Sequence, residues 1–407
     1  MDAETSPSVQ CKVVKASTKE SYQGASESLR DLAELDISAK QCERITQHIG
    51  RERVAQRNAA LVEYEELPWP EQRRTPSHAP ANAWTGRVAA VIVDGGRAQI
   101  RDERWGTEYQ PGEKRRRWWR EPKAACLATF ASQIHPQDPL PEVPSCLLDP
   151  LWLIPKVLEI KRTRRAEVEG EPAARNETPA ALPVDEEPQH WSPPPLVRSL
   201  VATFGNYEQL GRLARVEAWQ RGFDTAVRKV FLGDGHLANW SVHEARFSDY
   251  TPIADLLHAL SYVYTAAVES SPDMEASWPL CVRWITAVWQ GRVSQVLAEL
   301  EPLLAAARSP ESHEKLRTCL SFLRNNASRM QYDQYRQRGL PITTVLIESA
   351  VKQLNKRMKG TEMFWKSGAE PQLQLRADLL SETQPLDHYW KTRPLLQTGF
   401  RNRCTKP

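Results

Sequence analysis

Two short apolar segments, each ending in an aspartate beside glycine, constrain the fold of this chain more than any other feature. Residues 86–101 are "GRVAAVIVDGGRAQIR", and residues 228–235 are "RKVFLGDG". Short continuous runs rich in β-branched residues are typical of buried strands, and glycine next to aspartate is typical of the turn that ends one. We therefore expect Asp94 and Asp234 to stand at strand ends, where their side chains can reach a common point.

Further strands are predicted beside the first. The Gly-Gly pair at 95–96 predicts a turn into a second strand, and "KAACLATFA" at 123–131 predicts a third. Strand, hairpin and strand, with an aspartate closing the first strand, is typical of the opening of a ribonuclease-H-like sheet. The expected fold class is therefore α/β, with a mixed sheet and flanking helices.

The N-terminal region, residues 1–83, is predicted to be helical and to end in a linker. Apolar residues recur at three- and four-residue spacing, and Ser38 with Gln41 forms a capping box that opens a new helix. Two short helices with a tight joint are compatible with a DNA-binding helix-turn-helix or with a plain helical hairpin. The turn-rich residues 67–83 predict the linker.

The remaining chain divides into three parts. Residues 84–252 form the first part of the sheet domain, 253–338 are predicted to be an all-helical insertion, and 339–407 complete the domain with a further helix. Residues 161–195 are rich in charge and proline and are predicted to be disordered.

Composition bounds the functional class only loosely. The seven cysteines include no CxxC pair, which argues against a zinc ribbon or a disulfide framework. Neither a signal peptide nor an apolar run long enough for a membrane span is present, so a cytoplasmic location is expected. The net charge of +3 does not indicate nucleic-acid binding, but basic residues cluster locally at 113–120, 161–165 and 352–360.

Three carboxylates stand at element boundaries: Asp94, Asp234 and Glu348, the last in the first turns of the helix after "GLPI". Gathered carboxylates repel one another and are stable chiefly when divalent cations neutralise them. Taken singly, each aspartate is more often a turn residue, and Glu348 can simply pair with Lys352 on its own helix.

The order of these blocks resembles a known family. The segments "VDGGR", "LGDG" followed by "DLLHAL", and "YDQYRQRGLPI" followed by "IESAVKQLNKRMKG" occur in that order between residues 93 and 360, within a match that runs from about residue 25 to the C-terminus. They resemble bacterial insertion-sequence DDE transposases of the Kra type, which are Mutator-like enzymes of the ribonuclease-H-like superfamily. The resemblance implies a catalytic domain with a large helical insertion between the second aspartate and the glutamate.

The resemblance also implies roles for individual residues. Asp94, Asp234 and Glu348 would be the catalytic, metal-binding triad, with Mg²⁺ as the cofactor, Mn²⁺ as a substitute, and two ions. Asp255 and His258 match the family's (Cys/Asp)-x-x-His accessory motif; they would contact DNA, support the metal site, or form a structural pair.

DNA contacts are expected from the basic helix after Glu348 and from the basic run near Asp94. The expected DNA-binding residues are Lys352, Lys356, Arg357, Lys359, Arg116, Arg117 and Trp365. The cations would bind phosphates, and the tryptophan would stack on an unpaired base. The alternatives are a solvated helix face for the cations and core packing for Trp365.

The expected function is therefore transposition: metal-dependent cleavage of DNA at element ends and strand transfer into target DNA. The expected partners are double-stranded DNA, as terminal inverted repeats and target, and further copies of the chain in a synaptic complex. The alternative is an inactive, truncated or decayed copy that only binds DNA. Thr343, Thr344 and Val345 favour this alternative, because family members have a glycine-serine-glycine turn there.

Overall fold

The computed structural model describes residues 5–74, 84–96, 98–100, 119–169, 192–358 and 365–393. Arg116, Arg117 and Lys359 therefore lie outside the described residues. No helix within the described ranges combines the length and the apolar character needed to cross a bilayer.

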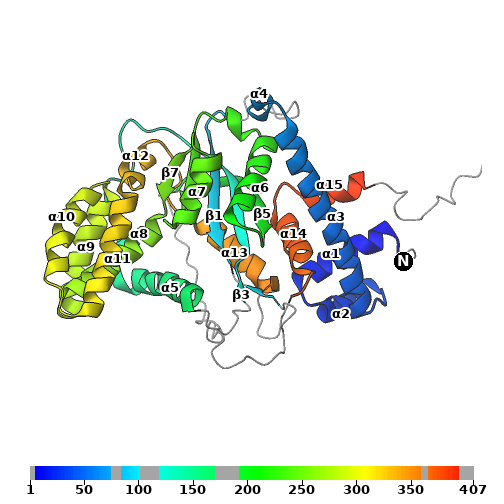
Figure 1. The fold of residues 1–407 in the computed structure, drawn as a ribbon, viewed down its shortest axis with the longest axis horizontal. Coiled ribbons are helices and arrows are strands. Elements are labelled where there is room, and N and C mark those ends of the chain that lie inside the picture. Colours follow the sequence, from blue (N-terminus) through cyan, green and yellow to red (C-terminus); the bar gives the residue numbers. More distant parts are fainter. Residues whose placement is uncertain are drawn as a thin grey trace, which may run out of the picture.

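A five-stranded mixed sheet forms the centre of the molecule (Figure 1). Its strands are, in spatial order, β5 (Pro195–Thr203), β4 (Lys123–Ala131), β1 (Arg87–Gly95), β6 (Lys229–Gly233) and β7 (Thr251–Ala254). β4 runs antiparallel to β1 and β5, whereas β6 is parallel to β1 and β7. The α/β class and the mixed sheet are thus as expected.

The strand β1 lies at the centre of the sheet because both of its faces are apolar. Every residue from Val88 to Val93 is fully buried, as expected for a strand covered on both sides. The predicted hairpin after Gly95 is wrong. The antiparallel partner of β1 is β4, while β2 (Ala98–Gln99) pairs with β3 (Trp119–Arg120) in a separate two-stranded sheet. A central nine-residue strand needs a partner of its own length, which β4 supplies and β2 does not.

Helices cover the sheet. α6 (Tyr207–Gln220) packs against β4 and β5 and against α7 (Leu237–Arg246), which follows β6. α13 (Val345–Met358) packs against β1 and β4, and α14 (Ala369–Leu380) packs against β5. The helix that carries Glu348, α13, therefore packs directly against β1, the strand that carries Asp94.

The expected helical run between residues 253 and 338 is present and lies at one end of the molecule in Figure 1. It consists of α8 (Leu256–Ser270), α9 (Met274–Trp289), α10 (Val293–Ala305), α11 (Pro310–Asn326) and α12 (Tyr332–Gln337). α5 (Pro150–Glu169) packs against α8.

The prediction of disorder from residue 161 is wrong for residues 161–169, because α5 continues to Glu169. Arginine and glutamate are the most frequent residues of this stretch, and their high helix propensity extends the helix beyond its apolar part. Residues 170–191 lie outside the described residues, and residues 192–194 lead into β5.

The N-terminal helices lie at the other end of the molecule, beside α14 and α15 (Pro385–Thr392) (Figure 1). They are α1 (Pro7–Lys19), α2 (Tyr22–Ala33) and α3 (Ala39–Glu66), whereas the short α4 (Trp69–Gln72) follows α3 and lies at the top of the view. The capping box of Ser38 and Gln41 is formed. The expectation of two short helices is wrong for the second, because α3 has 28 residues.

Close packing and charge fix α3 to the C-terminal helices. A Cβ added at Gly50 would lie 2.7 Å from the Cβ of Pro371, so only glycine allows this approach. Arg53 donates to the Asp378 carboxylate, which is 4% exposed. Contacts with residues more than 300 positions later in the chain therefore help to stabilise the long helix, together with its packing against α1 and α2.

Candidate metal centre

Asp94 and Asp234 are neighbours at the carboxyl ends of two parallel strands. Ile92 of β1 is in register with Leu232 of β6, and each aspartate lies two residues further along the chain, Asp94 near the end of β1 and Asp234 directly after β6. Asp94 Oδ1 accepts the N–H of Gly95 at 2.8 Å. Asp234 Oδ1 accepts the backbone N–H of His236 at 2.9 Å and the Nδ2–H of Asn239 at 2.8 Å.

Glu348 reaches the same end of the sheet from the first turns of α13. The Thr344 hydroxyl donates to Glu348 Oε1 at 3.0 Å. The segment before α13 is joined to the start of α8, where the N–H of Leu256 donates to the carbonyl oxygen of Ile342 at 3.0 Å.

Asp255 connects these elements and is fully buried. Its Oδ2 accepts the backbone N–H of His258 at 2.7 Å and contacts the Nδ1 of the same residue at 2.8 Å. Its Oδ1 accepts the N–H of Thr344 at 2.6 Å. An ionised carboxylate only accepts hydrogen bonds, so Nδ1 of His258 carries the proton and Nε2 is left as the second ring donor or ligand.

Among the residues that the structure describes, one group of side chains is close enough to share an ion. Asp255, His258 and Glu348 each offer a ligand atom, and these atoms all lie within 4.8 Å of one another. Carboxylate oxygens suit Mg²⁺ and Mn²⁺, and an imidazole nitrogen adds affinity for transition metals. This group could therefore hold a divalent metal ion.

The electrostatics of Asp94 and Glu348 point to the same conclusion. Burial, and then the charges of Asp234 and Glu348, raise the pKa of Asp94 well above its usual value. Burial, and then the charge of Asp255, raise the pKa of Glu348. A bound cation would relieve this repulsion and stabilise the ionised carboxylates.

His258 is the positive counterpart of these carboxylates. Burial alone would lower its pKa, but the hydrogen bond and charge of Asp255, with the charges of Asp234 and Glu348, raise it to about 9. The imidazole therefore compensates part of the carboxylate charge in the metal-free protein.

The structure brings the predicted triad to one end of the sheet but groups the donor atoms differently from the expectation. Asp255 and His258, expected as an accessory motif, stand next to Glu348. Asp94 instead directs an oxygen at the N–H of Gly95, and Asp234 directs one at the N–H of His236 and the side chain of Asn239 in α7. The i,i+3 spacing predicted that Asp255 and His258 share one helix face, but Asp255 is instead the N-cap of α8, and its side chain accepts the backbone N–H of His258.

The expected DNA-binding residues on α13 comprise two exposed lysines and one buried arginine. Lys352 is exposed and pairs with Glu159 of α5 at 2.8 Å, and Lys356 is also exposed. Both remain accessible to a phosphate.

Arg357 and Trp365 do not fit the expectation of DNA contact, because both are buried. Arg357 Nε donates to the carbonyl oxygen of Ser17, and its guanidinium lies 4.8 Å from the Trp365 ring centroid. Trp365 Nε1–H donates to the carbonyl oxygen of Met358 at 2.9 Å. The pair holds the end of α13 against the N-terminal helices, which is the core-packing alternative for Trp365.

Tyr207 lies beside the two aspartates and was not expected. Its hydroxyl donates to Glu121 Oε1 at 3.0 Å. Burial, followed by the charges of Glu121, Asp234 and Asp94, raises the pKa of Tyr207 far above its usual value. No local pattern around residue 207 marks it, because only the pairing of distant strands brings it to the site.

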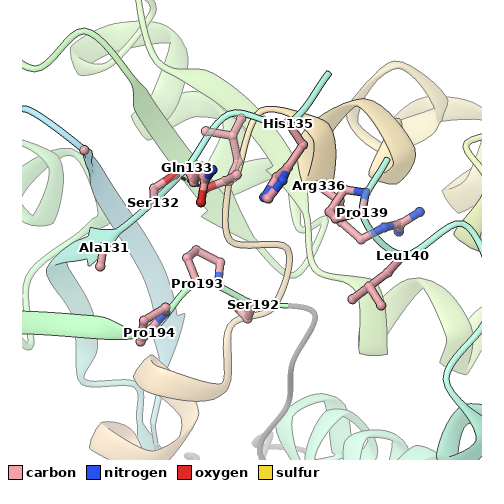
Figure 2. Close-up of a pocket in the computed structure, with 13 residues that line it drawn as sticks. Ala131, Ser132, Gln133, His135, Pro139, Leu140, Ser192, Pro193, Pro194 and Arg336 are labelled. Carbon is pink, nitrogen blue, oxygen red and sulfur yellow. Dashed lines mark hydrogen bonds between the residues drawn. The ribbon is translucent and has the colours of Figure 1, made fainter. Parts of the chain in front are cut away.

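A cavity of about 470 Å³ lies away from these carboxylates. Gly86, before β1, and Ala131, at the end of β4, border it, so it is at the opposite end of β1 from Asp94. Figure 2 shows Gln133 and His135 across the cavity from Ser192 and Pro193. The described residues that line it include no carboxylate, so we assign it no part in metal binding.

Comparison with known proteins adds no relative to this description. No protein-family model matches the sequence, and a search of curated proteins finds no significant match.

Proposed function

We propose that this chain is a DDE transposase, which cleaves DNA at the ends of a mobile element and joins them to target DNA. The observation that carries the proposal is the convergence of three carboxylates from distant parts of the sequence. Asp94, Asp234 and Glu348 stand at one end of the sheet, where the charges of Asp234 and Glu348 add to burial in raising the pKa of Asp94.

The arrangement of the sheet supports the proposal. Three antiparallel strands open the domain in chain order, and two parallel strands then extend the sheet on the other side of β1. This agrees with the ribonuclease-H-like sheet that the sequence resemblance implies. The helical run enters between Asp234 and Glu348, where the resemblance implies the insertion.

The side chains divide into ligands and positioning residues. Asp94, Asp234 and Glu348 would hold Mg²⁺ or Mn²⁺, and Nε2 of His258 would be a further metal ligand beside them. Asp255 fixes the imidazole of His258, which is how carboxylates commonly orient a histidine at a metal site. When bound, divalent cations activate an attacking hydroxyl and stabilise the leaving oxygen of a phosphodiester.

The basic face of α13 would bind the DNA backbone. Lys352 and Lys356 follow Glu348 on the same helix at four-residue spacing, so phosphates bound by them lie near the carboxylates. Joining two element ends requires both ends in one complex, so the proposal includes a homo-oligomer on double-stranded DNA.

The experiment is a cleavage and joining assay on labelled DNA that carries the flanks of the gene, with Mg²⁺ or Mn²⁺. The variant Asp234→Asn keeps an oxygen for the N–H of His236 and for Asn239 but loses the charge. Asp273→Asn, an exposed helix cap distant in sequence from the centre, is the matched control for loss of a carboxylate.

We expect the wild-type chain and Asp273→Asn to produce metal-dependent 3′ ends and joined products, and Asp234→Asn to produce neither. Cleavage by Asp234→Asn at the wild-type rate would refute the proposed role of the carboxylates. DNA binding without cleavage by the wild-type chain would instead support the alternative, an inactive copy that only binds DNA.

A further inference from the structure

We propose that Thr344 is a positioning residue that orients the Glu348 carboxylate for metal binding, and that Asp255 fixes Thr344 in place. This inference rests on the proposed function, since it concerns the same metal centre. It assigns a role to a residue that departs in sequence from the family's glycine-serine-glycine turn.

The first step is the contact between Thr344 and Glu348. The Thr344 hydroxyl donates to Glu348 Oε1 at 3.0 Å, and the N–H of Glu348 donates to the carbonyl oxygen of Thr344 at 3.1 Å. One carboxylate oxygen is thereby fixed, and the other is left for a cation. Thr344 is only 2% exposed, so water does not readily replace its hydroxyl.

The second step is the attachment of Thr344 to β6, the strand that precedes Asp234. The N–H of Thr344 donates to Asp255 Oδ1 at 2.6 Å, and the N–H of Asp255 donates to the carbonyl oxygen of Gly233 at 2.9 Å. Gly233 immediately precedes Asp234. A continuous chain of hydrogen bonds therefore sets Glu348 relative to Asp234.

The third step compares Thr344 with the residue before it, Thr343. Thr343 is also buried, at 6% exposure, but its hydroxyl makes no hydrogen bond to Glu348 among the contacts of the described residues. Replacing threonine by valine at 343 or at 344 therefore changes buried volume and polarity in the same way, but only the replacement at 344 removes a hydrogen bond to Glu348. A partner that orients a metal ligand typically contributes about 10- to 100-fold to metal affinity.

The test is Mn²⁺ binding to the metal-free full-length chain, measured by isothermal titration calorimetry and by the electron paramagnetic resonance signal of free Mn²⁺. The variants are Thr344→Val, Thr344→Ser and Thr343→Val. Valine keeps the backbone N–H that binds Asp255 and removes only the hydroxyl, while serine keeps the hydroxyl. Thr344→Ala against Thr344→Ser provides the same comparison if valine prevents folding.

We expect Thr344→Val to weaken Mn²⁺ binding by about tenfold or more, with Thr344→Ser and Thr343→Val close to wild type. Equal affinity of Thr344→Val and the wild-type chain, equal weakening by Thr343→Val, or no Mn²⁺ binding by the wild-type chain would each overturn the inference. DNA cleavage is measured on the same samples. A wild-type chain that binds Mn²⁺ without cutting DNA would refute the proposed function and leave the result on Thr344 standing.

Discussion

The substitution Asp255→Asn tests how much the centre depends on one buried carboxylate. Asparagine has the same shape but offers one acceptor oxygen and one NH₂ group. In the wild-type chain, Oδ1 accepts from Thr344, and Oδ2 accepts from both the backbone N–H and the Nδ1–H of His258. Whichever way the amide is turned, its NH₂ group faces a backbone N–H that cannot accept a hydrogen bond.

The expected cost follows from these contacts. At least one hydrogen bond to a charged acceptor is lost, which is worth about 1.5–3 kcal/mol, and a buried donor is left unsatisfied at about 1–3 kcal/mol. Asp255 is fully buried, so water cannot compensate. We expect Asp255→Asn to lower the free energy of unfolding by about 3–5 kcal/mol.

The assay is urea unfolding of the metal-free chain, followed by the fluorescence of its 14 tryptophans. Asp273→Asn is the matched control, because Asp273 also caps a helix and accepts the N–H of Ala276 at 2.8 Å, but is exposed. Aspartate and asparagine cap helices about equally well, so the control should change stability by less than about 0.5 kcal/mol.

Equal stability losses in the two variants would refute the reasoning. The result would mean that Asp255 acts only as the cap of α8, and that its bond to Thr344 contributes nothing to the fold. A loss confined to Asp255→Asn would establish that the buried carboxylate joins α8 to the start of α13.

Three further predictions concern the carboxylates, the N-terminal helices and DNA. Asp94→Asn should stabilise the metal-free chain at neutral pH, because the raised pKa means that the ionised Asp94 carboxylate is unfavourable in the folded chain. The stability that this carboxyl contributes is present below its unfolded pKa and is lost as the pH rises through its folded pKa. Urea unfolding at pH 5 and pH 8 checks this, and an unchanged pH dependence in the variant would contradict it. Arg53→Ala should lower the free energy of unfolding by about 3–5 kcal/mol, because it leaves the Asp378 carboxylate buried without its ion-pair partner. The control Arg51→Ala, at an exposed arginine of the same helix, should have little effect. Equal losses of stability in the two variants would mean that α3 is not held by the ion pair of Arg53 and Asp378. Lys356→Ala should reduce the slope of log K for DNA binding against log salt by about 1, measured by filter binding, and an unchanged slope would exclude a phosphate contact by Lys356.

Local pattern was enough to predict much of the fold. The continuous apolar runs predicted β1, β4 and β6, because a strand buried on both faces needs apolar residues at every position. Helical spacing predicted the run α8 to α12, and the box of Ser38 and Gln41 predicted the start of α3. Of the candidate centre, Asp94, Asp234, Glu348, Asp255 and His258 were all named in advance, the last two through a motif.

The tertiary structure alone decided how these parts meet. The sequence could not show that β1 pairs with β4 rather than with β2, or that Arg357 and Trp365 are buried against the N-terminal helices. It also could not show that Thr344 binds Asp255, 89 residues away. Periodicity and capping are set by neighbours within a few residues, whereas strand partners, buried charges and ligand geometry depend on segments that only the folded chain brings together.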